Sequence, residues 1–222
     1  MRKIFIIFIF AVFAVPLWAK GEEILILGRS SSTTETVPIY DSATARIFGR
    51  SFVLIGKSSA VRKNQFLTKS STYVMQMFVQ NIAAYDAIRV CTDSTPNADN
   101  ALNAFDSQNV VAIRLDFVSY LNEGPQREFS DAFRANGIDT KDPAIAQFLS
   151  LVGENSVVPG DSLTIVIERN VGGNDVLLLE NTKGMVGKIV GSLLARLITS
   201  LWIGRPSIDR QPDFARKLLC GM

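Results

Sequence analysis

The stretch SSAVRKNQFLTKSSTYVMQMFV, residues 58–79, contains a single arginine and ends in a strand-like run. Residues 72–79 are rich in the residue types that favour pleated strands, and the preceding run SFVLIG at 51–56 predicts another strand. Arg62 lies between these runs, eleven residues before Tyr73. We interpret Arg62 either as a solvated charge on a strand or as the cation of a ligand site.

The rest of the sequence predicts helices and strands that belong to one domain. The predicted elements are a short helix at about 98–105, a half-exposed strand at 110–118, helices at 126–137 and 142–153, and a hairpin of strands at 162–169 and 175–181. Asp142 is expected to be the N-cap of the second of those central helices. This order favours an α+β fold with a mostly antiparallel sheet.

The stretch GKIVGSLLARLITSLWIG, residues 187–204, is apolar enough to resemble a membrane segment. Its apolar pairs recur every four residues, whereas Lys188, Ser192, Arg196 and Ser200 fall on the opposite side. That spacing predicts one long, one-sided helix packed on the sheet. A short last helix is expected in QPDFARKLLCG at 211–221.

The N-terminus has the pattern of a secretory signal peptide. Arg2 and Lys3 precede fifteen uncharged residues, 4–18, and Ala19 and the polar sequence KGEE follow. We expect cleavage after Ala19, a periplasmic or secreted location, an N-terminal strand and Ser/Thr-rich segment at 20–47, and one folded domain at 48–222. Without Arg2 and Lys3 the chain has equal numbers of basic and acidic residues, 21 of each, which argues against a nucleic-acid or anionic-membrane partner.

Several kinds of chemistry have no support in the sequence. The chain has no histidine, no glycine-rich phosphate motif and no cysteine spacing typical of zinc sites, so no cofactor or metal is expected. Its aspartates at 139, 142 and 161 stand at turns or helix starts, where capping explains them. Cys91 and Cys220 could form one disulfide or remain two buried thiols.

Six segments in order resemble the chalcone isomerase-like superfamily. They are IGKSSAVRKNQF at 55–66, STYVMQMFV at 71–79, FSDAFRANG at 129–137, VVPGDSLTIVIER at 157–169, LLARLITSLWIGRPSID at 193–209 and DFARKLLCG at 213–221. The resemblance implies an open-faced β-sandwich, in which a layer of helices covers a large antiparallel sheet and a ligand cleft lies between them. Some members of this superfamily cyclise chalcones, and others bind fatty acids in the same cleft.

The resemblance assigns residues to that cleft. Arg62 matches the shared arginine, Tyr73 or Thr72 falls at the hydroxyl of the next strand, and Asn136 matches an asparagine of the enzymes. Two hydroxyl residues of the enzymes are replaced by Phe129 and by Leu201, which is beside Trp202. These replacements remove donors that order the enzymes' reactants, and losing one such donor costs about 3 to 4 kcal/mol of transition-state stabilisation.

The leading hypothesis is therefore an exported, non-catalytic binder of a small apolar anion resembling a fatty acid. Arg62 would pair with the head group, Tyr73 or Thr72 would hydrogen-bond to it, and Phe129, Leu201 and Trp202 would line the tail. One alternative is an isomerase of an enone or phenol, with Arg62 as electrophile and Asn136 as orienting residue. Another is an envelope structural or interaction protein whose cleft has collapsed.

Overall fold

The structure is a computed structural model that describes residues 44–63, 69–121, 125–153, 157–169, 173–204 and 212–220. Within these ranges, the side chains of 61–63, 69–71, 185 and 212–213 lie outside the description. The predicted signal peptide at 1–19 and the strand candidate EEILILG at 22–28 also lie outside the described residues.

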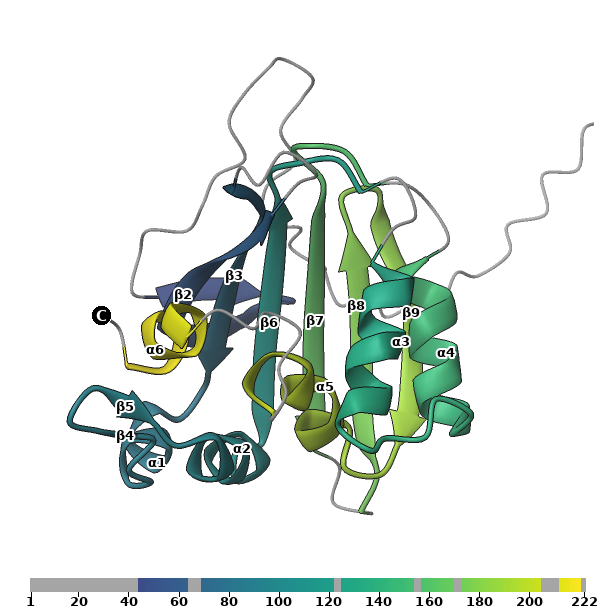
Figure 1. Cartoon of the computed structure of the whole chain (residues 1–222). Coiled ribbons are helices and arrows are strands. Elements are labelled where there is room, and N and C mark those ends of the chain that lie inside the picture. Colours follow the sequence, from purple (N-terminus) through teal and green to yellow (C-terminus); the bar gives the residue numbers. More distant parts are fainter. Residues whose placement is uncertain are drawn as a thin grey trace, which may run out of the picture.

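Seven antiparallel strands of the described chain form one large sheet in the order β1-β2-β3-β6-β7-β8-β9 (Figure 1). The strands are β1 (Thr44–Ile47), β2 (Arg50–Lys63), β3 (Lys69–Val79), β6 (Val110–Phe117), β7 (Ser162–Arg169), β8 (Asp175–Asn181) and β9 (Gly184–Gly191). A two-residue ribbon pairs β4 (Cys91–Thr92) with β5 (Thr95–Pro96). The strands predicted at 51–56, 72–79, 162–169 and 175–181 are confirmed, and β1 begins four residues before the predicted domain start.

A layer of helices covers one face of the large sheet (Figure 1). The helices are α1 (Ile82–Asp86), α2 (Ala98–Asp106), α3 (Gln126–Ala135), α4 (Pro143–Val152), α5 (Leu194–Ile203) and α6 (Pro212–Cys220). The main apolar core lies between this layer and the sheet. The predicted α+β fold, a large antiparallel sheet covered by a layer of helices, is confirmed.

The start of α4 agrees with its prediction in detail. The Asp142 side chain accepts hydrogen bonds from the backbone N–H groups of Ala144, at 2.9 Å, and Ile145, at 3.3 Å. These bonds satisfy two of the donors that an α-helix leaves without partners in its first turn. No helix among the described residues combines the length and the apolar character needed to cross a membrane.

The single long helix predicted at 187–204 is wrong. Its first part is strand β9, which pairs along β8, and α5 begins only at Leu194. Gly187 and Gly191 explain the difference, because a Cβ at either position would lie within 3 Å of an α4 side chain. Glycine favours this close approach of β9 to α4 and disfavours a helix. Of the residues expected on the polar side, Lys188 and Ser192 are exposed, but Ser200 is buried and donates to the Leu197 carbonyl.

The strand predicted at 110–118 is confirmed as β6, but its expected half-exposure is wrong, because all eight residues of β6 are buried. One face of β6 joins the main core beneath the helices. The opposite face carries Arg114 and Asp116, which form an ion pair with Nε and Oδ1 2.8 Å apart. Alternation of polar and apolar residues along β6 therefore marks two different buried environments, one apolar and one ionic.

A second, smaller apolar cluster covers part of that opposite face. Ala45, Ile47 and Phe52 from β1 and the start of β2 belong to one cluster with residues of the central strands, Phe78, Val110, Ala112 and Val166. An ion pair between Arg50 and Glu168, at 2.8 Å, connects the start of β2 to β7. The sheet therefore has apolar packing on both faces.

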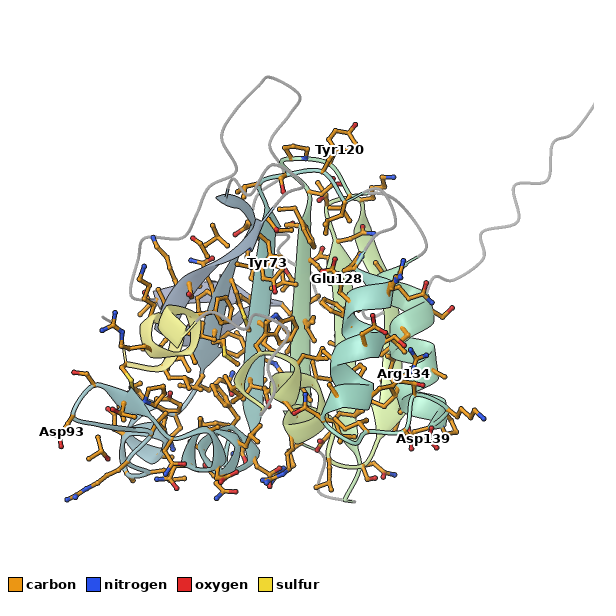
Figure 2. All side chains as sticks on the ribbon, in the orientation of Figure 1. Tyr73, Asp93, Tyr120, Glu128, Arg134 and Asp139 are labelled. Carbon is orange, nitrogen blue, oxygen red and sulfur yellow. A yellow bond between two sulfur atoms is a disulfide. The ribbon has the colours of Figure 1, made fainter. Side chains whose placement is uncertain are left out.

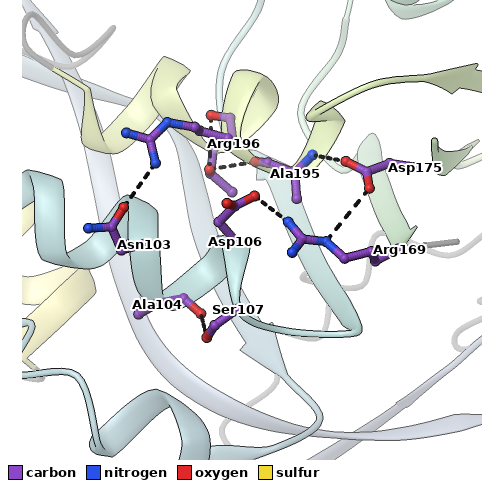
Figure 3. A network of polar contacts seen from close by, with 9 residues as sticks. Asn103, Ala104, Asp106, Ser107, Arg169, Asp175, Ala195 and Arg196 are labelled. Atoms are coloured by element: carbon purple, nitrogen blue, oxygen red, sulfur yellow. Dashed lines mark hydrogen bonds and ion pairs between the residues drawn. The ribbon is translucent and has the colours of Figure 1, made fainter. Parts of the chain in front are cut away.

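Polar contacts at one end of the sheet connect α2, α5 and the β7–β8 hairpin (Figure 3). Arg169 pairs with Asp106 of α2, and its Nε lies 3.9 Å from Asp175. Asp175 in turn accepts a hydrogen bond of 3.1 Å from the N–H of Ala195 in the first turn of α5. Because Leu193 provides no side-chain cap, Asp175 performs that role from another strand.

The question left open for the cysteines is answered by the structure. Cys91 and Cys220 form a disulfide, with Cα atoms 5.8 Å apart, that attaches the end of α6 to β4. The two residues are 129 positions apart. In the chain-entropy account, closing a loop of this length stabilises the fold by about 4 to 5 kcal/mol.

Helix α6 also contacts β2 at a position where only glycine fits. A Cβ at Gly56 would lie 1.8 Å from the carbonyl oxygen of Leu218 in α6. We expect Gly56→Ala to displace α6 and to lower the free energy of unfolding by about 2 to 3 kcal/mol. Urea unfolding monitored by circular dichroism measures this change.

Ser59→Ala, at an exposed position of the same strand, is the control and should change the free energy of unfolding by less than about 0.5 kcal/mol. Equal effects of the two variants would contradict the close contact between Gly56 and α6.

Asp116 generates a prediction about pH. Burial raises its pKa above the ordinary value of 3.8, and Arg114 opposes the shift. A raised folded-state pKa gives stability that is fully present below the unfolded value and is lost as pH rises through the folded value. Asp116→Asn lacks this loss, so the free energy of unfolding of wild type minus that of the variant should decrease from pH 3 to pH 7. Urea unfolding at both pH values measures this difference, and an increase from pH 3 to pH 7 would show that the ion pair outweighs desolvation.

Candidate functional site

Arg62 is the second-last residue of β2, and its backbone pairs with Ser70 of β3. Two residues earlier, Ala60 pairs with Tyr73. The two strands predicted to carry the ligand site are therefore adjacent at this end of the sheet. The side chain of Arg62 lies outside the described residues.

Tyr73 is buried between the sheet and the helical layer (Figure 2). Its side chain is 4% exposed and shares the main core with Met75 and Met77 of the same strand. Its hydroxyl oxygen accepts a hydrogen bond of 3.1 Å from the indole Nε1–H of Trp202. A polar pair of side chains thus connects β3 to α5 through an apolar interface.

Trp202 also contacts the aromatic side chain of α3 that was predicted to line the site. Its ring lies edge-on to Phe129, with centroids 5.5 Å apart, and Phe129 stacks on Phe148 of α4 at 5.9 Å. Phe129 is 1% exposed, and Leu201 and Trp202 are fully buried. The structure brings Tyr73, Phe129 and Trp202 together, but as side chains packed against one another.

Thr72 lies at a bulge in strand β3, directly before Tyr73. Ala60 pairs with Tyr73 and Val61 with Ser71, so Thr72 is the extra residue of a β-bulge in β3. Its carbonyl accepts hydrogen bonds from the N–H groups of Val118 and Ser119. Thr72 is buried, like Tyr73. Of the two predicted hydroxyls, that of Tyr73 makes a hydrogen bond between the sheet and the helices.

Asn136 connects the ends of two helices. It is the C-cap of α3, and its Nδ2 donates a 2.9 Å hydrogen bond to the carbonyl of Ala132. A Cβ at Gly204 would lie 2.4 Å from the Asn136 Oδ1, so this side chain packs directly against the end of α5. Its observed contacts support the arrangement of α3 and α5.

A cavity of about 150 Å³ lies beside this cluster, between α4 and the ends of β6, β7 and β8. Phe117 connects the two regions, because it lines the cavity and also contacts Tyr73 edge-on with centroids 6.0 Å apart. Phe129, Leu201 and Trp202 do not line this cavity. Its residues were not predicted, since they come from separate strand ends and connections that share no motif: Phe117, Pro125, Leu151, Val152, Gly153, Val157, Asp161, Ser162, Leu163, Asn181, Thr182 and Lys183.

No three side chains of the metal-binding types His, Cys, Asp and Glu are clustered anywhere in the described ranges. Asp116, whose pKa is raised by burial, pairs with Arg114 on the face of β6 opposite the helix-facing core. Between α5 and the middle of the sheet, the polar contact in this apolar environment is the hydrogen bond of Tyr73 and Trp202.

Comparison with solved structures identifies a protein whose fold is similar to that of this chain. A fatty-acid binding protein of Arabidopsis thaliana is similar over 78% of this chain and 96% of its own, with a TM-score of 0.52 and 19% sequence identity. The chain has the chalcone isomerase-like fold. No family model matches the sequence, and no curated protein matches it. The predicted resemblance to this superfamily is confirmed at the level of the fold.

Within this chalcone isomerase-like fold, the contact between Tyr73 and Trp202 can be tested by removing one oxygen atom. Tyr73→Phe leaves the indole N–H of Trp202 buried without this acceptor, which should cost about 1 to 3 kcal/mol of folding stability. Urea unfolding measures the loss, and the indole N–H resonance of Trp202 should shift.

Tyr120→Phe is the matched control, because Tyr120 is 64% exposed in the connection that leaves β6 (Figure 2). It should leave both readouts almost unchanged. An unperturbed Trp202 resonance in Tyr73→Phe would contradict the described hydrogen bond.

Proposed function

We propose that the protein is a non-catalytic binder of a small apolar anion of the fatty-acid type. The site is the interface between the helix-facing side of β2 and β3 and the helices α3 and α5. Tyr73 would donate a hydrogen bond to the anion, and Arg62 would supply the compensating charge.

The hydrogen-bonded pair of Tyr73 and Trp202 is the observation that carries this proposal. An apolar helix-to-sheet interface requires no phenol or indole for packing alone, and buried polar groups cost stability unless they are hydrogen-bonded. The two groups lie on β3 and α5, so they can position an oxygen atom between sheet and helices. A pocket with a few convergent polar groups in apolar surroundings is typical of small-molecule sites.

The similar solved structure supports the ligand class. The Arabidopsis protein is described as a fatty-acid binding protein, and its likeness to this chain spans most of both molecules. Phe129 and Leu201 stand where the resemblance expects hydroxyl residues of the enzymes, and both are buried in the core. Apolar side chains at these positions favour retention of an acyl chain over catalysis of ring closure.

The closeness of the packing favours a second candidate, an interaction protein without a small ligand. Phe129, Trp202 and Tyr73 are almost completely buried by contacts within the chain. In that case the Tyr73–Trp202 contact would serve only to join α5 to the sheet. Arg62→Met should then be neutral or stabilising, as when apolar bulk replaces a buried ion pair.

We propose in addition that the chain is exported. The N-terminal pattern at 1–19 supports export, and the disulfide between Cys91 and Cys220 is consistent with an oxidising compartment. After removal of residues 1–19 the mature chain would begin at Lys20.

Native mass spectrometry of the protein purified from its own cells tests the proposed ligand and export together. We expect a mass that begins at Lys20 and a bound fatty acid that is released by organic extraction. Arg62→Ala should lose most of this ligand, because a charge-assisted hydrogen bond contributes about 1.5 to 3 kcal/mol, a factor of roughly ten or more in affinity.

Arg46→Ala is the matched control, since Arg46 is an exposed arginine of β1 that bonds to the Gly49 carbonyl. It should retain the ligand. Wild-type protein without any bound acid, together with an Arg62→Met variant of unchanged or higher stability, would contradict the binder and support the interaction protein.

A further inference from the structure

We propose that the cavity beside α4 is a second binding site, separate from Arg62 and Tyr73, for a short monocarboxylate with an apolar part of about six carbons. The site has an apolar floor, a polar rim and one lysine, Lys183, at its edge. It requires no contribution from the Arg62 side chain.

The floor of the cavity is made by residues that belong to the core of the fold. Phe117 and Leu163 come from neighbouring strands, and Val152 comes from the last turn of α4. All three are buried, so they form a firm apolar surface. The cavity volume of about 150 Å³ is comparable to that of a cavity that holds benzene, which sets the size of the apolar part that can rest on this floor.

The rim is polar, but most of its side chains already hold the local turns together. The Asp161 Oδ2 accepts a 3.0 Å hydrogen bond from the N–H of Val158, and the Thr182 hydroxyl accepts one of 2.6 Å from the N–H of Ser162. The Asn181 Oδ1 accepts one of 2.8 Å from the N–H of Lys183. These contacts stiffen the rim and engage its acceptor atoms.

Lys183 differs from these residues because its ammonium group makes no ion pair in the described structure. Helices offer no net preference for charge here, since α3 begins at the cavity with Pro125 and α4 ends there with Val152, so that their dipoles oppose each other. Asp161 keeps its negative charge but holds the Val158 N–H within its own turn, whereas the Lys183 ammonium group is left to pair with a ligand. A carboxylate therefore suits the rim better than an ammonium group.

Phe117 separates this cavity from the site of the proposed function. One side of its ring contacts Tyr73, and Phe117 also lines the cavity. A ligand in the cavity would therefore lie on α4 and the ends of β6 to β8, and it would leave the contact between Tyr73 and Trp202 unchanged. The two sites can be distinguished residue by residue.

Titration of the ¹⁵N-labelled mature protein with hexanoate, followed by backbone amide and indole resonances, tests the proposal. We expect saturable shifts at Gly153, Ser162 and Lys183, with little change at the Trp202 indole. Pentylammonium, with the same alkyl chain as hexanoate and the opposite charge, should bind more weakly. Lys183→Gln should weaken hexanoate binding by about fivefold, the size of a partly exposed charged contact, whereas Lys141→Gln, at another exposed lysine, should not.

Two more variants separate this site from the proposed fatty-acid site. Val152→Phe fills the floor and should abolish the cavity shifts, with thermal unfolding used to verify that it folds; Arg62→Ala should leave them intact. Shifts only at Tyr73 and the Trp202 indole that disappear in Arg62→Ala would support the proposed function and overturn the second site.

Cavity shifts that disappear in Arg62→Ala would also overturn the second site. So would cavity shifts that are the same in Lys183→Gln as in wild type. Shifts nowhere with hexanoate would overturn the cavity site, whereas the proposed function would still be judged by the fatty acid copurified with the protein.

Discussion

Complete burial of strand β6 is the constraint on which the rest of the structure depends. This strand lies between β3 and β7, and every one of its residues is buried. Its two faces therefore both need a cover, and each needs a different kind. The helix layer covers the apolar face, while β1 and the start of β2 contribute apolar packing on the other.

The two faces differ in what they allow chemically. On the face away from the helices, Arg114 and Asp116 neutralise each other inside the protein, and burial still raises the pKa of the carboxyl. Such a pair is weak support for stability, because desolvation offsets the attraction between the charges. On the helix-facing side, the groups that meet between β3 and α5 are neutral, the phenol of Tyr73 and the indole of Trp202. A neutral hydrogen-bonding pair in apolar surroundings can accept an anion without first breaking an ion pair.

The cavity and the Tyr73–Trp202 contact share one side chain, Phe117, yet they have different structural origins. The Tyr73–Trp202 contact joins the middle of the sheet to a helix. The cavity is formed where strands end and connections begin, and its polar side chains stabilise those connections. Variation in the connections could therefore change the cavity while the central packing remains the same, since loops tolerate substitution better than the core does.

The sequence by itself determined those helices and strands whose signals lie in neighbouring residues. The Asp142 cap and Gly153 bounded α4, strand-favouring residues identified β3 and β7, and the order of segments indicated the chalcone isomerase-like fold. These features depend on residues close together in the chain. The same reasoning failed at 187–204, where an apolar spacing of four residues fits both a helix and a strand followed by a helix.

Only the tertiary structure decided the features that join distant residues. The glycines of β9 became interpretable once α4 was seen to pack against them, and the bond between Cys91 and Cys220 crosses 129 positions. The hydroxyl of Tyr73 met the indole of Trp202 across 129 positions, and Lys183 was brought to the cavity by a turn. The physical reason is that burial, register and the meeting of strand ends are properties of the packed chain, and no window of sequence contains them.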